Sequence, residues 1–329
     1  FIREKKLPFT CYWMDAGWFG PPHDAEEYQN LSTEDWYGLV GDWRVNSLMH
    51  PQGLRPVSDA AHAAGMDFLL WIEPERAVAG TPVTLEHPEW CLHLPPEMER
   101  PPAGKYESVD ALFFDYSNPD ALAWMTDRVD AIIKEQGVDV YRQDMNTNPV
   151  PYWRYCEPEN RRGVTQMKHV EGLYRFLDEL LRRNPGLMID NCSGGGKRID
   201  IEMLKRSVPL HRSDYTVHFD ANPVCGQSQG YGIMHWVPYS GMGSLLRDGD
   251  TYQFRSEMNA SLLLSVRRAA GRDLSPEQMM VGVEPGVTWE WHREMMRQHA
   301  QVAHLFSGDF YPLCKCSCTV KKQATENNR

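Results

Sequence analysis

Short apolar runs that end in polar or acidic residues recur along this chain, and they constrain its fold more than any other feature. The two clearest are residues 9–14, which precede Asp15, and residues 66–72, which precede Glu73. Apolar runs of this length, bounded by turn-forming residues, are typical of strands that are buried on both faces of a parallel sheet. Further runs of this kind occupy residues 111–114, 138–143, 187–190 and 208–211.

Helical patterns separate these runs. Helices are expected over residues 53–65, 118–135 and 163–183, from about residue 199, and over residues 288–306. Asn118 followed by Pro119 is typical of a helix cap and first turn. Residues 21–50 and 81–104 show no period, the second being rich in proline, and they predict long loops.

Strands that alternate with helices predict an α/β fold. Six units are clear, and the less clearly typed apolar runs at residues 232–239 and 260–266 bring the count to eight. Eight units favour a (β/α)8 TIM barrel over a doubly wound sheet. We expect the barrel over residues 1–312, followed by a polar, cysteine-containing tail over residues 313–329 that lacks fixed structure. Its alternating cysteines could bind a soft metal, which is the less favoured reading.

The catalytic groups of such a barrel lie at the carboxyl ends of its strands. That position is expected for Asp15, Glu73, Asp115, Asp144, Cys192 and Asp214. Two carboxylates that face each other across a polar pocket are the minimum for cleaving a glycosidic bond. We predict that Asp144, after the fourth strand, is the nucleophile and Asp214, after the sixth, the acid/base. In a retaining enzyme their carboxyl groups would be about 5–5.5 Å apart.

Each of these two aspartates follows an arginine by two residues. Strand alternation puts Arg142 on the face of Asp144, where its charge would keep the carboxylate ionised. The alternative is a purely structural ion pair at the end of the strand. By the same alternation Arg212 would lower the pKa of Asp214, whereas a general acid needs the opposite shift. Arg212 must therefore point elsewhere or be neutralised by another acid.

Other residues allow a functional and a structural interpretation. The glycine run 194–196 permits close approach of a ligand, and a sugar ring fits better than a phosphate because the P-loop ending is missing. Cys192 has no assigned histidine partner, which favours a packed or sugar-contacting thiol over a nucleophile. Trp18, Trp43 and Trp71 could stack on sugar rings, although each taken singly is more typical of a core residue.

The composition of the chain excludes some classes of binding partner. A net charge of −11 argues against nucleic acid and anionic membranes, and no apolar run approaches the ~20 residues of a membrane helix. The eight cysteines are scattered, so reduced thiols are expected. With no visible signal peptide, this favours the cytoplasm, although the chain begins at Phe1 and leaves the compartment open. Acids spread over separate strands predict no metal and no cofactor.

Seven short motifs follow one another in a specific order. They are residues 14–20 (MDAGWFG), 41–43 (GDW), 71–75 (WIEPE), 87–90 (HPEW), 141–146 (YRQDMN), 192–196 (CSGGG) and 212–214 (RSD). Through them the chain resembles the melibiase-type α-galactosidases, glycoside hydrolase family 36, over roughly residues 8–312.

The resemblance implies a (β/α)8 catalytic barrel and a retaining mechanism. The family's nucleophile matches Asp144, and its acid/base matches Asp214. Sugar contacts are implied for Asp15, Trp43, Arg142, Cys192 and Gly195. The implied substrate is an α-linked oligosaccharide or glycoconjugate, and the family's oligomers make a homo-oligomer a candidate assembly.

This chain departs from the family pattern in two places in the motifs. Ala16 stands where the family usually has a second acid, and Arg142 and Gln143 stand where Lys and Trp are usual. These changes make α-N-acetylgalactosaminidase the runner-up activity. The family's flanking β-domains are not recognisable in this sequence, so we expect an isolated barrel. A sugar-binding barrel without turnover is the alternative from a different functional class.

Overall fold

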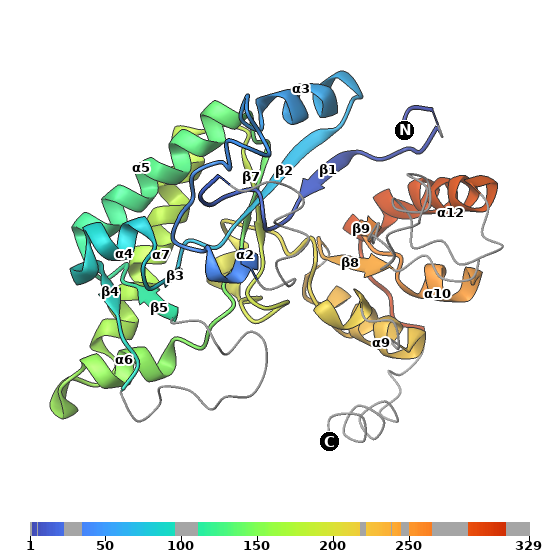
Figure 1. Ribbon diagram of the computed structural model, residues 1–329. Coiled ribbons are helices and arrows are strands. Elements are labelled where there is room, and N and C mark those ends of the chain that lie inside the picture. The colour runs from blue at the N-terminus through green and yellow to red at the C-terminus, as the bar shows by residue number, and fades with distance from the viewer. Residues whose placement is uncertain are drawn as a thin grey trace. The chain divides into compact units, whose positions relative to one another are not determined.

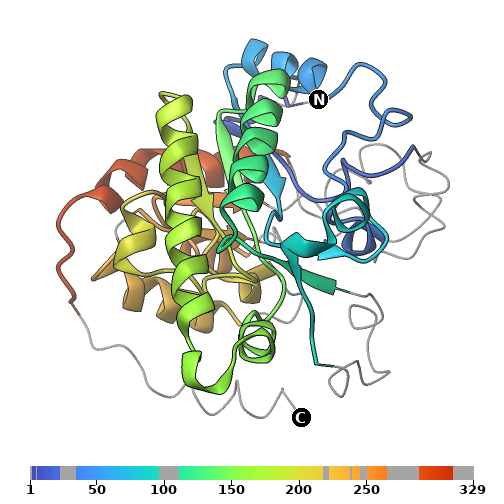
Figure 2. The ribbon, with the colours of Figure 1, turned by 90° about the vertical axis from the view of Figure 1, so that its left-hand side faces the viewer.

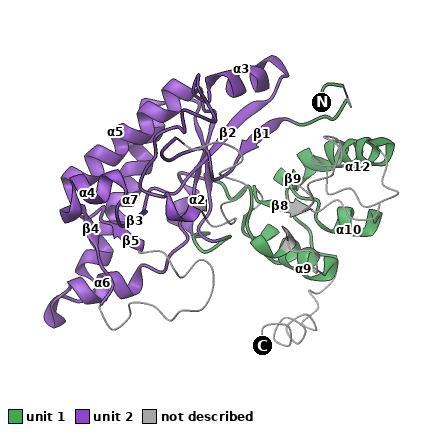
Figure 3. Cartoon of the chain, viewed as in Figure 1, with its two compact units in different colours: residues 1–9, 195–199, 208–329 green, residues 10–194, 200–207 purple. Residues whose placement is uncertain are grey.

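The computed structural model describes residues 2–4, 6–22, 35–95, 111–217, 222–237, 239–244, 250–264 and 289–313. The chain divides into two compact units (Figure 3). Unit 2 comprises residues 10–194 and 200–207, and unit 1 comprises residues 1–9, 195–199 and 208–329. Each unit is described by itself.

A four-stranded parallel sheet forms the centre of unit 2 (Figure 1). Its strands, in spatial order, are β1 (Cys11–Met14), β2 (Asp67–Ile72), β6 (Val140–Gln143) and β7 (Met188–Asn191). Every residue of β6, and every residue of β2 after Asp67, is buried. These two runs thus became strands that are covered on both faces, as expected for parallel sheets, whereas the residues of β1 are partly or fully exposed.

Two long helices pack beside each other in unit 2, as Figure 2 shows. They are α5 (Pro119–Gln136) and α7 (Val164–Arg183), and the shorter α3 (Arg55–Ala63) packs on β2. The side chain of Asn118 accepts hydrogen bonds from the N–H groups of Asp120 and Ala121, which confirms the predicted cap. Gly137, in the left-handed conformation, ends α5. Other short helices of this unit are α2 (Asp35–Gly38), α6 (Val150–Cys156), η4 (Glu159–Arg161) and α8 (Ile201–Leu204), in addition to two described below.

The third predicted strand is a strand, but it is not part of the parallel sheet. It is β5 (Ala111–Phe114), which pairs antiparallel with β3 (Arg76–Val78) and β4 (Cys91–Leu92). Asp144 therefore follows the third strand of the parallel sheet rather than the fourth. The predicted loop at residues 81–104 was also wrong in its first part, which holds α4 (Pro82–Glu86), η1 (Pro88–Trp90) and β4. Elements this short carry too few residues to show a period.

Unit 1 contains two parallel strands, β8 (Gly241–Ser244) and β9 (Ser261–Leu264). The helices among its described residues are η5 (Asp214–Val217), α9 (Pro223–Met234), α10 (Thr251–Ser256), α12 (Trp289–Val302) and η6 (Ala303–Ser307). The predicted strand at residues 208–211 is wrong in detail, because only a single bridge residue forms there. The segment still runs beside β8, since Gly241 N–H donates to Pro209 O at 2.7 Å, but a proline cannot donate in return.

A compact apolar cluster holds unit 1 together. Its buried members are Leu7, Phe254, Leu264, Met295 and Met296. Among the described residues, no helix is long and apolar enough to cross a membrane. The described cysteines are free thiols, as expected. The predicted tail lies outside the described residues after Leu313, and so do its cysteines.

Two helical glycines offer a matched test of the packing. A Cβ on Gly172 of α7 would lie 2.2 Å from the carbonyl oxygen of Tyr116, whereas one on Gly232 of α9 would meet nothing within 4 Å. We expect Gly172→Ala to lower the free energy of unfolding by about 1–3 kcal/mol. Gly232→Ala should instead raise it by about 0.5–1 kcal/mol, because alanine loses less backbone entropy in a helix. Urea unfolding measures both, and a stable Gly172→Ala variant would contradict the described packing of α7.

Candidate active site

The carboxyl ends of the four parallel strands meet at one edge of unit 2. Asp15 follows β1, Glu73 follows β2, Asp144 follows β6 and Cys192 follows β7. Parallel strands bring residues that are distant in sequence to the same edge, which is where barrel enzymes carry their chemistry. Asp115 does not join them, because it follows the antiparallel strand β5 and accepts hydrogen bonds from Ser117.

The carboxylate of Asp144 is buried, with 7% of the residue exposed, and both of its oxygens accept hydrogen bonds. Oδ2 accepts from Trp71 Nε1 at 3.0 Å and from Asn146 Nδ2 at 2.8 Å. Oδ1 accepts from the N–H groups of Met145 at 2.7 Å and Gly194 at 3.1 Å. These donors come from β2, from the loop after β6 and from the loop after β7, so three segments fix one carboxylate.

This environment lowers the pKa of Asp144 below its ordinary value. Burial acts in the opposite direction and is the largest single influence. The charge of Arg142 and the hydrogen bonds from Cys192, Asn146 and Trp71 together outweigh it. Asp144 is consequently an ionised carboxylate at neutral pH, which is the state that a nucleophile needs.

The charge of Arg142 acts on two carboxylates, those of Asp190 and Asp144. Its guanidinium forms a buried ion pair with Asp190, which lies opposite it in the register of β6 and β7. Burial on its own would lower the pKa of Arg142, but the charges of Asp190, Asp144 and Asp15 are among the influences that raise it. The predicted electrostatic influence on Asp144 is therefore present, but the ion pair that Arg142 forms is with Asp190. The sequence reasoning missed Asp190, although strand alternation places it on the face of Cys192.

Glu73 holds the loop that carries Asn146. This glutamate is fully buried and pairs with Arg76 through two hydrogen bonds of 2.9 and 2.8 Å. Its Oε1 also accepts from the N–H of Asn146 at 2.5 Å. Asn146 donates in turn to Asp144. The ion pair of Glu73 and Arg76 therefore helps to position Asp144, the nucleophile candidate, through Asn146.

A second buried network lies between β2, β6 and α7. Glu75 Oε1 accepts from Gln143 Nε2 at 2.8 Å, and Glu75 Oε2 is 2.9 Å from His169 Nε2. His169 Nδ1 accepts from the N–H of Tyr116 at 3.2 Å, so the proton must sit on Nε2, which donates to Glu75. Glu75, Gln143 and His169 are each 0% exposed. Glu75, Gln143 and His169 thus find hydrogen-bond partners in the interior.

The tryptophans that were considered as sugar platforms are buried. Trp18, Trp43 and Trp71 are 2–3% exposed. Trp43 packs against Phe114 and Trp124, and its Nε1 donates to Glu73 O at 3.3 Å. Their burial agrees with the core interpretation. Asp15, by contrast, is exposed, and its Oδ1 accepts a hydrogen bond from the N–H of Ala16 at 2.8 Å.

Asp214 and Gly195 belong to unit 1. Asp214 is the first residue of η5, its side chain is 53% exposed, and His211 Nε2 lies 3.0 Å from its Oδ1. Gly195 has φ +84°, and a Cβ there would lie 3.4 Å from Asp214 N and 3.7 Å from Asp214 Oδ2. Gly195 is therefore adjacent to the acid/base candidate. His211 was not among the predicted site residues.

Arg212 is directed at the neighbouring strand. Its Nη1 donates to Gly241 O at 3.0 Å and approaches Ser240 Oγ at 3.4 Å. Burial lowers the pKa of Arg212 to about 10. The expectation that Arg212 shares the face of Asp214 assumed a continuous strand, but Asp214 begins a 3-10 helix, so strand alternation does not apply there.

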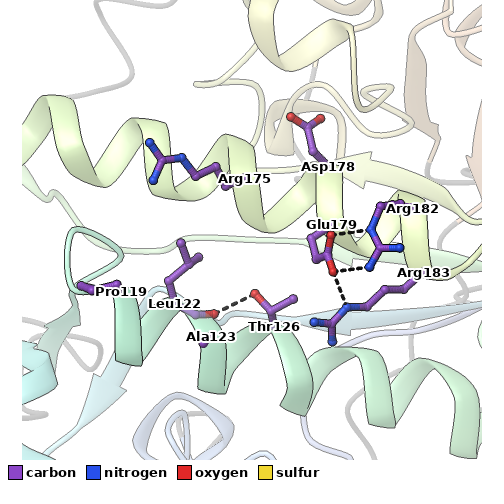
Figure 4. Close-up of a pocket in the computed structure, with 9 residues that line it drawn as sticks. All are labelled: Pro119, Leu122, Ala123, Thr126, Arg175, Asp178, Glu179, Arg182 and Arg183. Carbon is purple, nitrogen blue, oxygen red and sulfur yellow. Dashed lines mark hydrogen bonds and ion pairs between the residues drawn. The ribbon is translucent and has the colours of Figure 1, made fainter.

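The part of the chain that the structure describes contains no cluster of three or more histidine, cysteine, aspartate or glutamate side chains suited to a metal. A surface groove of about 510 Å³ lies between α5 and α7 (Figure 4). Within it, Glu179 pairs with Arg182 and Arg183. Two other lining residues, Arg175 and Asp178, pair with Glu171 and Arg206 outside it. None of the predicted site residues lines it, so we do not assign it a role in catalysis.

Residues 2–248 match the Melibiase family. The α-galactosidase AgaA of Geobacillus stearothermophilus is 30% identical over 231 residues, which cover 70% of this chain and 29% of AgaA. An α-galactosidase of Escherichia coli is 29% identical over 242 residues, covering 74% of this chain and 30% of the relative. The chain thus spans about 30% of the length of these curated relatives.

Solved structures agree on the fold. The crystal structure of AgaA, a GH36 α-galactosidase, aligns with a TM-score of 0.69 at 24% identity, over 92% of this chain and 39% of that one. The galactosidase domain of the α-galactosidase–sucrose kinase AgaSK aligns with a TM-score of 0.66 at 23% identity, over 92% and 38%. The fold class predicted from the sequence, a (β/α)8 barrel, is confirmed. The chain belongs to the melibiase family.

Proposed function

We propose that this chain is the catalytic barrel of a retaining exo-α-galactosidase, with Asp144 as nucleophile and Asp214 as acid/base. The observation that carries the proposal is the state of Asp144. It is a buried carboxylate, held ionised by Arg142 and by donors from three segments at the carboxyl edge of the parallel sheet. Membership of the melibiase family supports the assignment of the substrate class.

In the first step, an oxygen of Asp144 attacks C1 of the terminal galactosyl residue from the β face. The bond from C1 to the glycosidic oxygen breaks, and Asp214 gives its proton to that oxygen, so that the leaving alcohol departs neutral. The product is a galactosyl ester of Asp144. The fixed donors around Asp144 favour this reaction because they hold its carboxylate in one orientation before the substrate arrives.

In the second step, Asp214, now ionised, removes a proton from water as the water oxygen attacks C1. The ester bond breaks, Asp144 regains its charge and α-galactose leaves with retained configuration. Arg142 contributes in both steps. Before the first step its charge keeps Asp144 ionised, and in the second step it stabilises the carboxylate of Asp144 as that carboxylate leaves C1.

The substrate assignment has a direct test. A variant of AgaA with two substitutions has been solved in complex with raffinose, which supports an α-galactosyl oligosaccharide as the substrate of this chain. Hydrolysis of an aryl α-galactoside, α-N-acetylgalactosaminide and α-glucoside, followed by NMR of the first product, separates the candidates. We expect α-galactose to appear first. Preference for the N-acetylgalactosaminide would establish the runner-up activity, which was considered because Ala16 replaces the family's usual second acid. A β-anomer as the first product would contradict the retaining mechanism.

Removing the Asp144 carboxylate tests its role as nucleophile. Asp144→Ala should lower kcat by a factor on the order of 10³ or more, because the ester cannot form. Azide should restore turnover and yield β-galactosyl azide, since a small anion can occupy the vacated space. Asp115→Ala is the matched control, and it should retain activity within a few-fold, because Asp115 lies away from the sheet edge. Full activity of Asp144→Ala would refute the assignment.

The pH profile tests the electrostatics of Asp144. Activity requires its ionised form, so kcat/KM should fall as the pH drops through the pKa of Asp144, which lies below its ordinary value. In Cys192→Ala the thiol hydrogen bond is lost, the pKa of Asp144 rises, and the acid limb moves to higher pH.

Cys91→Ala is the control for this profile. Cys91 is a buried thiol at the start of β4, and burial raises its pKa to about 12, so it stays protonated. Its removal should leave the acid limb in place. An acid limb that stays unchanged in Cys192→Ala as well would show that the thiol does not tune Asp144.

A further inference from the structure

His211 and Asp214 form a close pair within unit 1. The imidazole is buried, with 4% of the residue exposed, whereas 53% of the Asp214 side chain is exposed. His211 Nε2 lies 3.0 Å from Asp214 Oδ1, within ordinary hydrogen-bonding distance. A buried ring thus holds one oxygen of a carboxyl group whose side chain is about half exposed.

The position of the imidazole proton follows from the other ring nitrogen. His211 Nδ1 is buried and has no hydrogen-bond partner among the described residues. A proton on Nδ1 alone would leave a buried donor unpaired and would remove the donor that faces Asp214. A proton on Nε2 satisfies the carboxylate and leaves at most an acceptor unpaired. His211 Nε2 is therefore the donor of this hydrogen bond.

The hydrogen bond sets how the carboxyl group of Asp214 is rotated. With Oδ1 held by His211, Oδ2 lies on the side of Gly195, 3.7 Å from where a Cβ of residue 195 would be. Gly195 has no side chain to occupy this space, and its φ of +84° disfavours any substitution. The carboxyl group is thus oriented by His211 from one side and left uncrowded by Gly195 on the other.

We propose that His211 is the positioning residue of the acid/base Asp214. The inference rests on the proposed function, in which Asp214 must first deliver a proton to the glycosidic oxygen and then accept one from water. Proton transfer depends on an aligned donor and acceptor, and it contributes typically about 10²–10⁴-fold to the rate. Without His211 the carboxyl group loses the hydrogen bond that fixes Oδ1, so it should spend less time in the productive orientation.

The test compares two leaving groups in two variants of the full chain. The leaving group of raffinose is sucrose, whose hydroxyl oxygen must be protonated as it departs. A 4-nitrophenolate is a much weaker base and can leave with little protonation. We expect His211→Leu to lower kcat/KM about 10-fold or more for raffinose and by no more than a few-fold for 4-nitrophenyl α-galactoside. His211→Gln, whose amide can reach Asp214 Oδ1, should restore most of the raffinose activity.

An equal loss on both substrates would overturn the inference, because damage to the fold lowers both alike. It would also be overturned if His211→Gln were no better than His211→Leu. Should the leucine variant fail to fold, His211→Asn replaces it, since its shorter amide cannot reach Oδ1. A wild-type chain that cleaves neither substrate would overturn the proposed function, and this inference with it, whereas a wild-type chain that cleaves both leaves only the role of His211 in question.

Discussion

A carboxylate can stay ionised inside a protein only when nearby charges and hydrogen bonds replace the water that it has lost. At Asp144 this replacement is shared among three segments of the chain, through Trp71 on β2, Asn146 after β6 and Gly194 after β7. The parallel sheet is what brings these donors together. The chemistry proposed for Asp144 therefore depends directly on the order β1-β2-β6-β7 of the strands.

Unit 2 contains two buried ion pairs close in sequence to the residues that hold this carboxylate. Arg142 pairs with Asp190, and Arg76 pairs with Glu73, all four with at most 5% of the residue exposed. Removing one member of such a pair leaves an uncompensated charge and typically costs about 3–5 kcal/mol. Apolar residues could fill the same volume, so stability alone does not explain these pairs. We infer that these pairs are present because they position Asp144 and the loop that follows it.

Much of the fold could be predicted from local patterns. The capped helix after Asn118, the amphipathic helix over α7 and the position of Asp144 at the end of a buried strand all follow from short stretches of sequence. The partner of a strand is different, because it depends on distant residues. Residues 111–114 have the apolar character of a barrel strand, yet they pair antiparallel with β3 and β4. Nothing in four apolar residues distinguishes the two outcomes.

The site shows the same division. Sequence reasoning found Asp144, Arg142 and Cys192 together at one edge, because each stands beside a strand end. It missed Asp190 as the partner of Arg142, since that pairing depends on the register between β6 and β7. It also missed His211, because a strand was assumed where the chain turns into η5. Partners that depend on register or on a break in a strand require the three-dimensional structure.

The central claim is that Asp144 forms a covalent bond to the sugar, and a trapping experiment tests it most directly. A fluorinated α-galactosyl substrate analogue that slows the second step should inactivate the protein and add one sugar to its mass. After proteolysis, the account predicts the adduct on the peptide that contains Asp144, with α-galactose protecting against labelling. Labelling of a different carboxylate, or turnover of α-galactosides without any covalent adduct, would contradict it.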